Sequence, residues 1–376
     1  MSWASVYGQE HAKSLLMRAI RNRQLAHAYL FWGIEGSGKD ALAFALARAV
    51  NCESGGPELC LECTSCRISD PLRHPNIHFV CPLPQGKNEK AGDDPVGVLS
   101  SEELETVKEQ LRLKGANPYH TIQIERAQFI KLNSIRSLKR ESALTEYGSG
   151  RNVFIISNAD AMNEEASNAL LKTLEEPPGK SLIILTSSWK ERLRETIVSR
   201  CQMIHLEPLP ESEIRRYLVE REEAKEANAE LIAVLSEGSI SAARGLLRHD
   251  ILGMRSGAIG FLRLALTNRR GALMHAIEET VVSGGKPGVE QFLRVLHQWL
   301  RDALILRDRG PEGIHDVGDR ADLERFTQRF PEADLIGALN RVDRAIALVG
   351  KNVYLSLLLT NLAIELRADL TAQRRS

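Results

Sequence analysis

Residues Gly33-Ile34-Glu35-Gly36-Ser37-Gly38-Lys39-Asp40 decide the fold of this chain. They match the phosphate-binding loop pattern G-x-x-x-x-G-K-[ST] at every fixed position except the last. The glycines allow successive backbone N–H groups to point into one concavity, and Lys39 can reach terminal phosphate oxygens from the start of a helix. The eighth position normally supplies a hydroxyl to Mg²⁺, and here it is the carboxylate of Asp40. We therefore expect a phosphate cradle whose metal-binding part is defective.

Strand and helix signals flank the loop in the order that this motif requires. The apolar run 27–32 precedes it, and the alanine- and leucine-rich stretch 41–50 follows it without glycine or proline. Further apolar runs of strand length occur at 77–80, 121–124, 153–156, 182–185 and 203–206. Because helical patterns lie between several of these runs, the sequence predicts an α/β core, a parallel sheet with helices on both faces.

The region between residues 82 and 140 carries three further predictions. Residues 82–97 contain Gly, Pro, Lys and Asp and predict a mobile insertion or loop. Apolar residues recurring every three positions then predict a helix with one buried face. They are Phe129, Leu132, Ile135 and Leu138. The same helix carries a basic face, which we interpret as solvated, with DNA contact as the alternative. This face consists of Lys131, Arg136, Lys139 and Arg140.

Length, charge and hydrophobic patterning limit the classes of protein to which this chain can belong. At 376 residues, and with about 150 residues per domain, the chain has room for about two or three domains. Lys plus Arg and Asp plus Glu each number 49, so no net charge steers the whole molecule toward nucleic acid. The apolar stretch 352–364 is shorter than the roughly 20 residues of a membrane-spanning helix. Residues 1–16 lack the apolar run of a secretion signal, so we expect a cytoplasmic protein without disulfides.

The predicted structure changes after Glu207. Strand signals stop at Pro208, and the remainder is predicted to be almost wholly helical. Short helical patterns at 211–221 and 227–236 end at Gly238 and predict a small helical domain. Longer amphipathic patterns follow at 292–304, 335–349 and 353–366. We therefore predict a core of residues 1–207, a small helical domain of residues 208–252 and a C-terminal helical domain of residues 253–376.

Four of the six cysteines gather directly after the helix predicted to follow the loop. Cys52, Cys60, Cys63 and Cys66 have the spacing C-x7-C-x2-C-x2-C. Four thiolates close the coordination sphere of a structural zinc ion, which would fold a module of about residues 50–82. The run 60–66 also begins like a ferredoxin motif, so an iron–sulfur cluster is the second interpretation and free buried thiols are the third. Cys81 and Cys201 are interpreted as core residues.

An ATPase with this loop needs an acidic pair at the end of a neighbouring strand, one carboxylate to hold Mg²⁺ and one to orient water. The candidate strand is 152–156, and Ser157 and Asn158 occupy the two expected positions. Asp160 follows two residues later, and we interpret it as the cap of a helix beginning near Asn163. Together with Asp40, these replacements leave binding of ATP or ADP open and argue against Mg²⁺ and hydrolysis.

Several motifs resemble one known family. They are Asn168–Pro178, with the sequence NALLKTLEEPP, then Ser199-Arg200-Cys201, the run 25–31 and the cysteine cluster. These motifs resemble the clamp-loader branch of the AAA+ proteins, and they are similar to subunits of bacterial DNA polymerase III clamp loaders. The resemblance covers residues 6–207 and extends to the helical remainder only as a pattern. It implies an AAA+ core with an inserted zinc module, an all-α lid and an all-α C-terminal collar domain.

Two branches of this family differ in how they handle ATP. The motor branch, gamma/tau, has a threonine in the loop, an acidic pair and an arginine in the small helical domain. This sequence departs from the motor pattern at Asp40, at Ser157-Asn158 and at Ser241. Arg244, one turn beyond Ser241, is a candidate for partial substitution. The resemblance implies the non-hydrolysing stator branch, and the alternative is a gamma/tau-like motor that uses Asp40 as a Mg²⁺ ligand.

The resemblance also implies that Arg200 acts on another subunit. It would project into a neighbour's ATP site as an arginine finger, because a planar and permanently charged guanidinium suits phosphate oxygens. The implied partners are gamma/tau and delta subunits in a ring, the sliding clamp, and primer–template DNA reached mainly through the complex. A third hypothesis is a redox-sensing DNA-repair factor, which requires iron and sulfide at the four cysteines.

Overall fold

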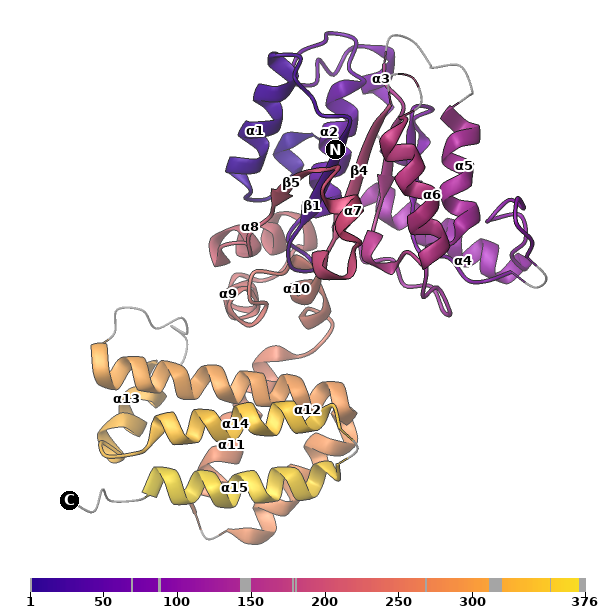
Figure 1. Cartoon of the computed structure of the whole chain (residues 1–376). Coiled ribbons are helices and arrows are strands. Elements are labelled where there is room, and N and C mark those ends of the chain that lie inside the picture. The colour runs from indigo at the N-terminus through magenta and orange to yellow at the C-terminus, as the bar shows by residue number, and fades with distance from the viewer. Residues whose placement is uncertain are drawn as a thin grey trace. The chain divides into compact units, whose positions relative to one another are not determined.

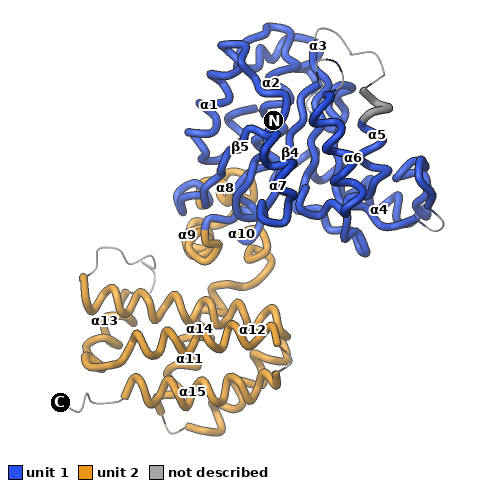
Figure 2. Tube along the Cα trace, viewed as in Figure 1, with its two compact units in different colours: residues 1–214, 238–242 blue, residues 215–237, 243–376 orange. Residues whose placement is uncertain are grey.

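The computed structural model describes residues 2–68, 70–86, 89–142, 150–177, 179, 181–267, 269–310, 320–351 and 353–371. The chain divides into two compact units (Figure 2). One unit comprises residues 1–214 and 238–242, and the other comprises residues 215–237 and 243–376. Pro178 of the NALLKTLEEPP stretch and the side chains of Lys139 and Arg140 lie outside the description. The division into three parts stays a prediction.

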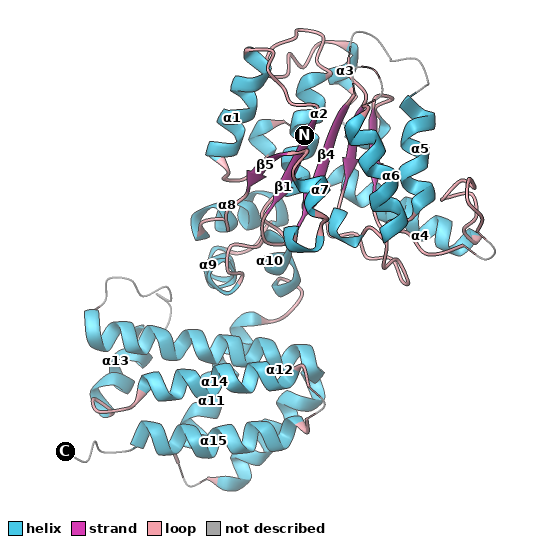
Figure 3. Cartoon of the chain, in the orientation of Figure 1, coloured by secondary structure: helices cyan, strands magenta, loops and turns pink. Residues whose placement is uncertain are grey.

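The first unit is built on a five-stranded parallel sheet in the order β2-β3-β4-β1-β5 (Figure 3). Its strands are β1 (Ala28–Trp32), β2 (Ile77–Val80), β3 (Val153–Ile156), β4 (Leu182–Ser187) and β5 (Gln202–His205). The three central strands are buried almost throughout, as expected where helices cover both faces of a parallel sheet. Five of the six predicted strand runs are therefore confirmed.

Helices cover both faces of this sheet (Figure 1). They are α1 (Glu10–Arg21), α2 (Lys39–Val50), α3 (Thr64–Arg67), α4 (Ser101–Ala116), α5 (Leu132–Ser142), α6 (Glu164–Glu175) and α7 (Glu195–Val198). Four 3₁₀ turns accompany them, at Trp3–Ser5, Pro71–Arg73, Ala159–Ala161 and Lys190–Arg192. Helix α2 packs against β1, β3 and β4. Leu30, Phe154 and Ile183 from the strands form a second core with α5, α6 and α7. The predicted α/β fold is confirmed.

Two predictions around α5 are wrong. Phe129 does not belong to the buried helix face, because it precedes α5 and its side chain is 56% exposed, whereas Ile135 and Leu138 are buried. Lys131 is not part of a solvated basic face, because its side chain is only 12% exposed and its Nζ lies 2.7 Å from Glu89. In each case a residue with helical spacing lies before the first residue of α5, so the sequence pattern placed the start of the helix too early.

The loop predicted at 82–97 is attached to the region around α5. The Asn133 side chain donates hydrogen bonds to Glu89 at 3.0 Å and to the Lys90 carbonyl at 2.8 Å. It also accepts a hydrogen bond from the backbone N–H of Gly92 at 2.8 Å. These contacts join the insertion to the core and explain why a polar residue is buried at the start of α5.

The second unit is helical. It contains α9 (Glu226–Leu235), α11 (Ile251–Ala265), α12 (Arg270–Arg309), α13 (Arg320–Arg329), α14 (Leu335–Val349) and α15 (Leu355–Thr371). Helices α8 (Glu211–Glu222) and α10 (Ile240–Leu246) contribute residues to both units. Helix α12 is broken at Gly285, where φ is 54° and Pro287 follows without a backbone N–H. None of the described helices is long and apolar enough to cross a membrane.

Candidate functional site

The phosphate-type loop joins the end of β1 to the start of α2. Gly36 and Gly38 have φ values of 79° and 96°, a region that glycine adopts without steric cost. A Cβ atom at Gly36 would collide with Ser239 and with the backbone of Ser241. The backbone N–H of Ile240 donates to the Gly36 carbonyl at 3.2 Å. Gly36 is therefore required by the close approach of residues 239–241.

Lys39 in the first turn of α2 points back into the loop. Its Nζ donates to the carbonyl oxygens of Gly33 and Ile34 at 2.8 and 2.7 Å and to Ser188 Oγ at 3.1 Å. Burial lowers the pKa of Lys39 to about 8, and the neighbouring Asp40 opposes that change. The ammonium that would hold a phosphate is thus satisfied by oxygen atoms of this chain.

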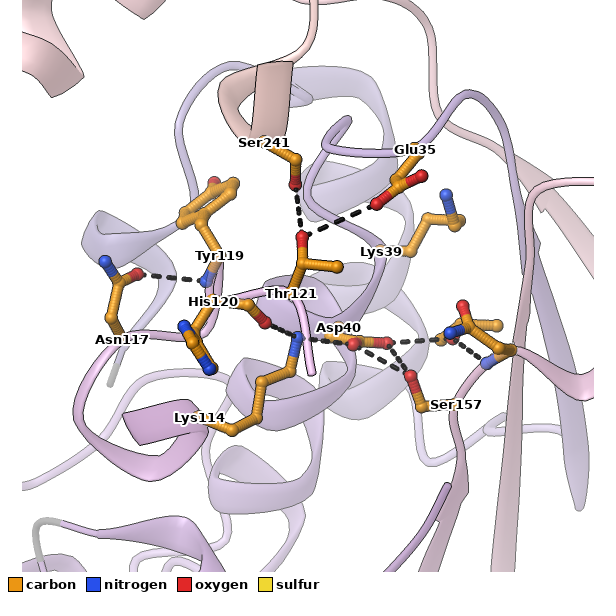
Figure 4. Close-up of polar contacts among 12 residues, drawn as sticks. Glu35, Lys39, Asp40, Lys114, Asn117, Tyr119, His120, Thr121, Ser157 and Ser241 are labelled. Atoms are coloured by element: carbon orange, nitrogen blue, oxygen red, sulfur yellow. Dashed lines mark hydrogen bonds and ion pairs between the residues drawn. The ribbon is translucent and has the colours of Figure 1, made fainter. Parts of the chain in front are cut away.

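Asp40 is buried in a group of hydrogen-bond donors (Figure 4). Lys114 Nζ lies 2.6 Å from its carboxylate, and Ser157 Oγ lies 3.1 and 2.9 Å from the two carboxylate oxygens. Thr186 Oγ1 donates to the same group at 2.8 Å. Burial alone would raise the pKa of Asp40, but the Lys114 ammonium and these hydrogen bonds hold it below its ordinary value. Asp40 is therefore an ionised carboxylate with local partners.

Lys114 is a site residue that the sequence does not reveal. It lies in the last turn of α4, far along the chain from the loop, and its side chain is 7% exposed. Besides Asp40, its Nζ contacts the carbonyl oxygen of His120, to which it donates at 2.9 Å. The only sequence signal is indirect, since a carboxylate in a buried loop requires a cation somewhere.

Asp160 does not cap a helix as predicted. Its carboxylate accepts hydrogen bonds from Ser187 Oγ at 2.7 Å and from the backbone N–H of Ser188 at 3.3 Å. Asn163 is the cap of α6, and its side chain accepts from the backbone N–H of Ala166 at 2.8 Å. Asp160 therefore holds the end of β4 and the residue after it in place. That residue, Ser188, also accepts a hydrogen bond from Lys39.

A cavity of about 640 Å³ opens beside the loop. Its walls include Gly38, Lys39, Lys114, Asn158 and the segment 118–125. This segment contains residues 121–124, predicted as a strand, which instead belong to none of the described strands, so that prediction is wrong. Ile122 and Ile124 line the cavity and pack against a small buried cluster with Cys81, Leu83 and Val107, which explains why apolar residues occur here outside the sheet.

Two side chains hold this segment over the loop. The hydroxyl of Tyr119 accepts a hydrogen bond from the backbone N–H of Tyr7 at 2.8 Å, and a Cβ at Gly38 would lie 3.1 Å from that hydroxyl. Thr121 Oγ1 donates to Ser241 Oγ at 3.1 Å. Ser241 stands where the motor pattern has an arginine, and its hydroxyl contacts Thr121 in the wall of the cavity. Arg244, the candidate substitute, donates to Glu222 at 2.7 Å within the second unit.

Arg200 lies at the opposite end of the sheet from the loop. It precedes β5, which runs parallel to β1, whereas the loop follows β1. Its guanidinium donates to Glu175 at 2.8 Å and to the Thr196 carbonyl at 3.0 Å, and its side chain is 38% exposed. Because Glu175 ends α6, the S-R-C and NALLKTLEEPP motifs are in contact. The guanidinium remains accessible to another chain.

The four clustered cysteines come together as predicted. The Sγ atoms of Cys52, Cys60, Cys63 and Cys66 all lie within 4.8 Å of one another, a spacing that one metal ion can bridge. Backbone N–H groups of Cys60, Cys63 and Cys66 donate to sulfur atoms of the cluster at 3.3, 3.4 and 3.4 Å. Four sulfur donors fit tetrahedral zinc or an iron–sulfur cluster. The fold therefore assembles a four-cysteine cluster that could hold a metal ion.

The two other cysteines lie apart from this cluster. Cys81 is buried, and burial raises the pKa of its thiol to about 12. Cys201 packs against the sheet core, and burial raises the pKa of its thiol to about 12 as well. Both behave as the core thiols that the sequence predicts.

Arg48 contacts the cysteine cluster from the last turn of α2. Its guanidinium is buried and donates to the Cys66 carbonyl at 2.9 Å. A cation beside thiolates favours their charged form and so favours metal binding. We expect Arg48→Met to weaken metal affinity about 10–100-fold in a chelator competition. The matched control is Arg67→Met, an exposed arginine of α3, and equal affinities for the two variants would contradict the role of Arg48.

The fold and the loop together define a class of protein. A parallel sheet in the order β2-β3-β4-β1-β5, with a phosphate-type loop between β1 and α2, is a core of the AAA+ type. The family model described as "DNA polymerase III, delta subunit" matches residues 8–210, more than half of the chain. The chain therefore belongs to this family.

Individual relatives agree with that assignment. The chain is 29% identical to DNA polymerase III subunit delta' of Bacillus subtilis over 271 residues, which cover 72% of this chain and 69% of the relative. It is 32% identical to subunit delta' of Escherichia coli over 60% of this chain and 55% of the relative. Subunit tau of E. coli is 29% identical over 66% of this chain, and the match spans only 33% of that longer protein.

Proposed function

We propose that this chain is the delta-prime-type subunit of a bacterial DNA polymerase III clamp loader. The family match and the two delta-prime relatives support this proposal. In this role it would help to load the sliding clamp onto primed DNA in the bacterial cytoplasm. Its partners would be gamma/tau and delta subunits, joined through a collar formed by the C-terminal helices, and it would reach DNA mainly through the complex.

The proposal of a non-hydrolysing subunit rests on the contacts that Asp40 makes. Phosphoryl transfer in such sites depends on a metal ion held by the loop hydroxyl and an acidic residue. Here the loop residue is a carboxylate already bound by Lys114, and Ser157 stands in the acidic position and donates to that carboxylate. Lys39 is held by carbonyl groups of its own loop. The side chains that would hold the metal and the terminal phosphate are therefore both engaged by groups of this chain.

Arg200 would give this subunit a part in catalysis without an active site of its own. As a donor in trans it would contact phosphate oxygens in the neighbour's site, after leaving its exposed pairing with Glu175. The four-cysteine cluster would hold a structural zinc ion, whose contribution is to fix a module without a core of its own. The chain would thus act as a stator that completes another subunit's site.

An ATPase measurement on the isolated chain tests the proposal. We expect no turnover above that of the Lys39→Ala variant, because the loop lacks a metal ligand set and a residue to orient water. The control is a gamma/tau motor subunit measured in the same assay. Steady turnover that Lys39→Ala abolishes would contradict the proposal and support the gamma/tau-like motor.

A further inference from the structure

Loops of this pattern use the residue after the lysine as a ligand of Mg²⁺. In this chain that residue is Asp40, and its nearest cation is the Lys114 ammonium at 2.6 Å. A carboxylate could in principle be a better ligand for Mg²⁺ than a hydroxyl. Whether Asp40 creates or eliminates a metal site therefore depends on what already occupies its oxygen atoms.

We infer that the Lys114 ammonium is the built-in cation of this loop and replaces the divalent metal, so that the site takes neither Mg²⁺ nor Mn²⁺. This inference rests on the proposed non-hydrolysing function and gives it a structural cause. It assigns Lys114 as the residue that determines the metal specificity of the cavity.

The hydrogen bonds of Asp40 support this inference. An ionised carboxylate offers about four lone-pair positions on its two oxygens. Oδ1 accepts from Thr186 at 2.8 Å and from Ser157 at 3.1 Å. Oδ2 accepts from Ser157 at 2.9 Å and contacts Lys114 Nζ at 2.6 Å. Because the single Ser157 proton is shared between the two oxygens, three donors surround the carboxylate, and the one with the shortest contact is the Lys114 ammonium, which a metal ion would have to displace.

Lys114 is the donor whose loss would expose a cation site. Its removal would leave a buried anion with two hydroxyl oxygens beside it, and hard divalent ions prefer such oxygen ligands. Its ammonium is also fixed by the His120 carbonyl, and its side chain is 7% exposed. A buried charge that loses the countercharge in direct contact with it is strongly destabilising, whereas removal of both charges is often nearly neutral. We therefore expect Lys114→Met alone to be strongly destabilised, and the double variant that removes both charges to be nearly as stable as the wild type.

The experiment compares wild type, Lys114→Met and Asp40→Asn/Lys114→Met, each loaded with the metal of its cysteine cluster. The readouts are melting temperature in buffer without added divalent ions and in MnCl₂ or MgCl₂, together with Mn²⁺ binding by electron paramagnetic resonance. Without added divalent ions, Lys114→Met should melt about 6–20 °C below the double variant, which lacks the same contact with His120. Mn²⁺ at about 100 times its Kd should restore about 5–10 °C to Lys114→Met alone.

Every outcome decides the inference. Mn²⁺ binding by the wild type that the double variant lacks would overturn it, and so would a melting temperature of Lys114→Met that does not rise with Mn²⁺. If Lys114→Met does not fold, a folded double variant supports the charge pairing, whereas failure of both variants contradicts it. The proposed function is tested separately, because ATP turnover by a wild-type chain without Mn²⁺ affinity would overturn the function and leave the Lys114 assignment intact.

Discussion

Replacing Arg200 with alanine should abolish most of the DNA-stimulated ATP turnover of a reconstituted loader while leaving its assembly unchanged. An arginine finger contributes about 10³–10⁵ in rate at the site that it completes. The structure presents this guanidinium on the surface, held by Glu175 and the Thr196 carbonyl and with no part in the core. Its loss should therefore alter turnover and not stability. Steady-state ATPase with primed DNA and clamp measures the effect.

The structure offers two matched controls for this measurement. Arg194 is another exposed arginine that pairs with α6, through Glu164 at 2.6 Å, and Arg194→Ala should leave turnover within about twofold. Glu175→Gln removes the anionic partner of Arg200 and should preserve turnover, since the guanidinium remains. Unaltered turnover in Arg200→Ala would eliminate the finger assignment, whereas loss in all three variants would indicate a general disturbance of α6.

Removal of the metal from the four-cysteine cluster should unfold the module around it. Structural zinc binding contributes about 10–16 kcal/mol in small zinc-binding peptides, and that energy is folding energy. Here the cysteines connect a four-residue helix, α3, and irregular chain, so the metal would be the main cross-link. We expect a strong chelator, or Cys60→Ser/Cys63→Ser, to lower the melting temperature and to make the remaining cluster thiols reactive.

Thiol counting and metal analysis measure this effect together. The cluster thiols should become reactive after chelation, whereas Cys81 and Cys201 should stay slow because burial raises the pKa of each thiol. Cys201→Ser serves as the control and should keep the metal. One zinc per chain and no iron is the expected composition. Iron with sulfide would instead support the redox-sensing hypothesis, and a metal-free protein of full stability would contradict a structural site.

Periodic patterns predicted the sheet well because the central strands are buried on both faces. A continuous apolar run such as 153–156 is typical of a strand that is covered on both faces, and here all four residues are buried. The run 121–124 also alternates apolar residues but lines a cavity outside the sheet, where Thr121 contacts Ser241, a residue distant in the sequence. Phe129 fitted a spacing of three but lies before α5, because helix starts depend on local geometry that spacing does not encode.

The candidate site could be predicted in part. Asp40 was detectable as a departure from a fixed motif, and the cysteine spacing predicted a cluster that the fold assembles. Lys114 was not detectable, because the pairing of α4 with the loop is a tertiary contact between residues 40 and 114. The contact of Thr186 with Asp40 was equally undetectable, because it joins β4 to α2. Sequence therefore indicates where a motif is defective, and the fold shows what compensates for the defect.

The central claim is that this chain completes a neighbour's ATP site and has no working site of its own. The most direct measurement is the DNA-stimulated ATPase of a reconstituted loader that carries either Lys39→Ala or Arg200→Ala in this subunit alone. The account predicts near wild-type turnover for Lys39→Ala and loss of most turnover for Arg200→Ala. The reverse result, turnover lost with Lys39→Ala and kept with Arg200→Ala, would contradict it.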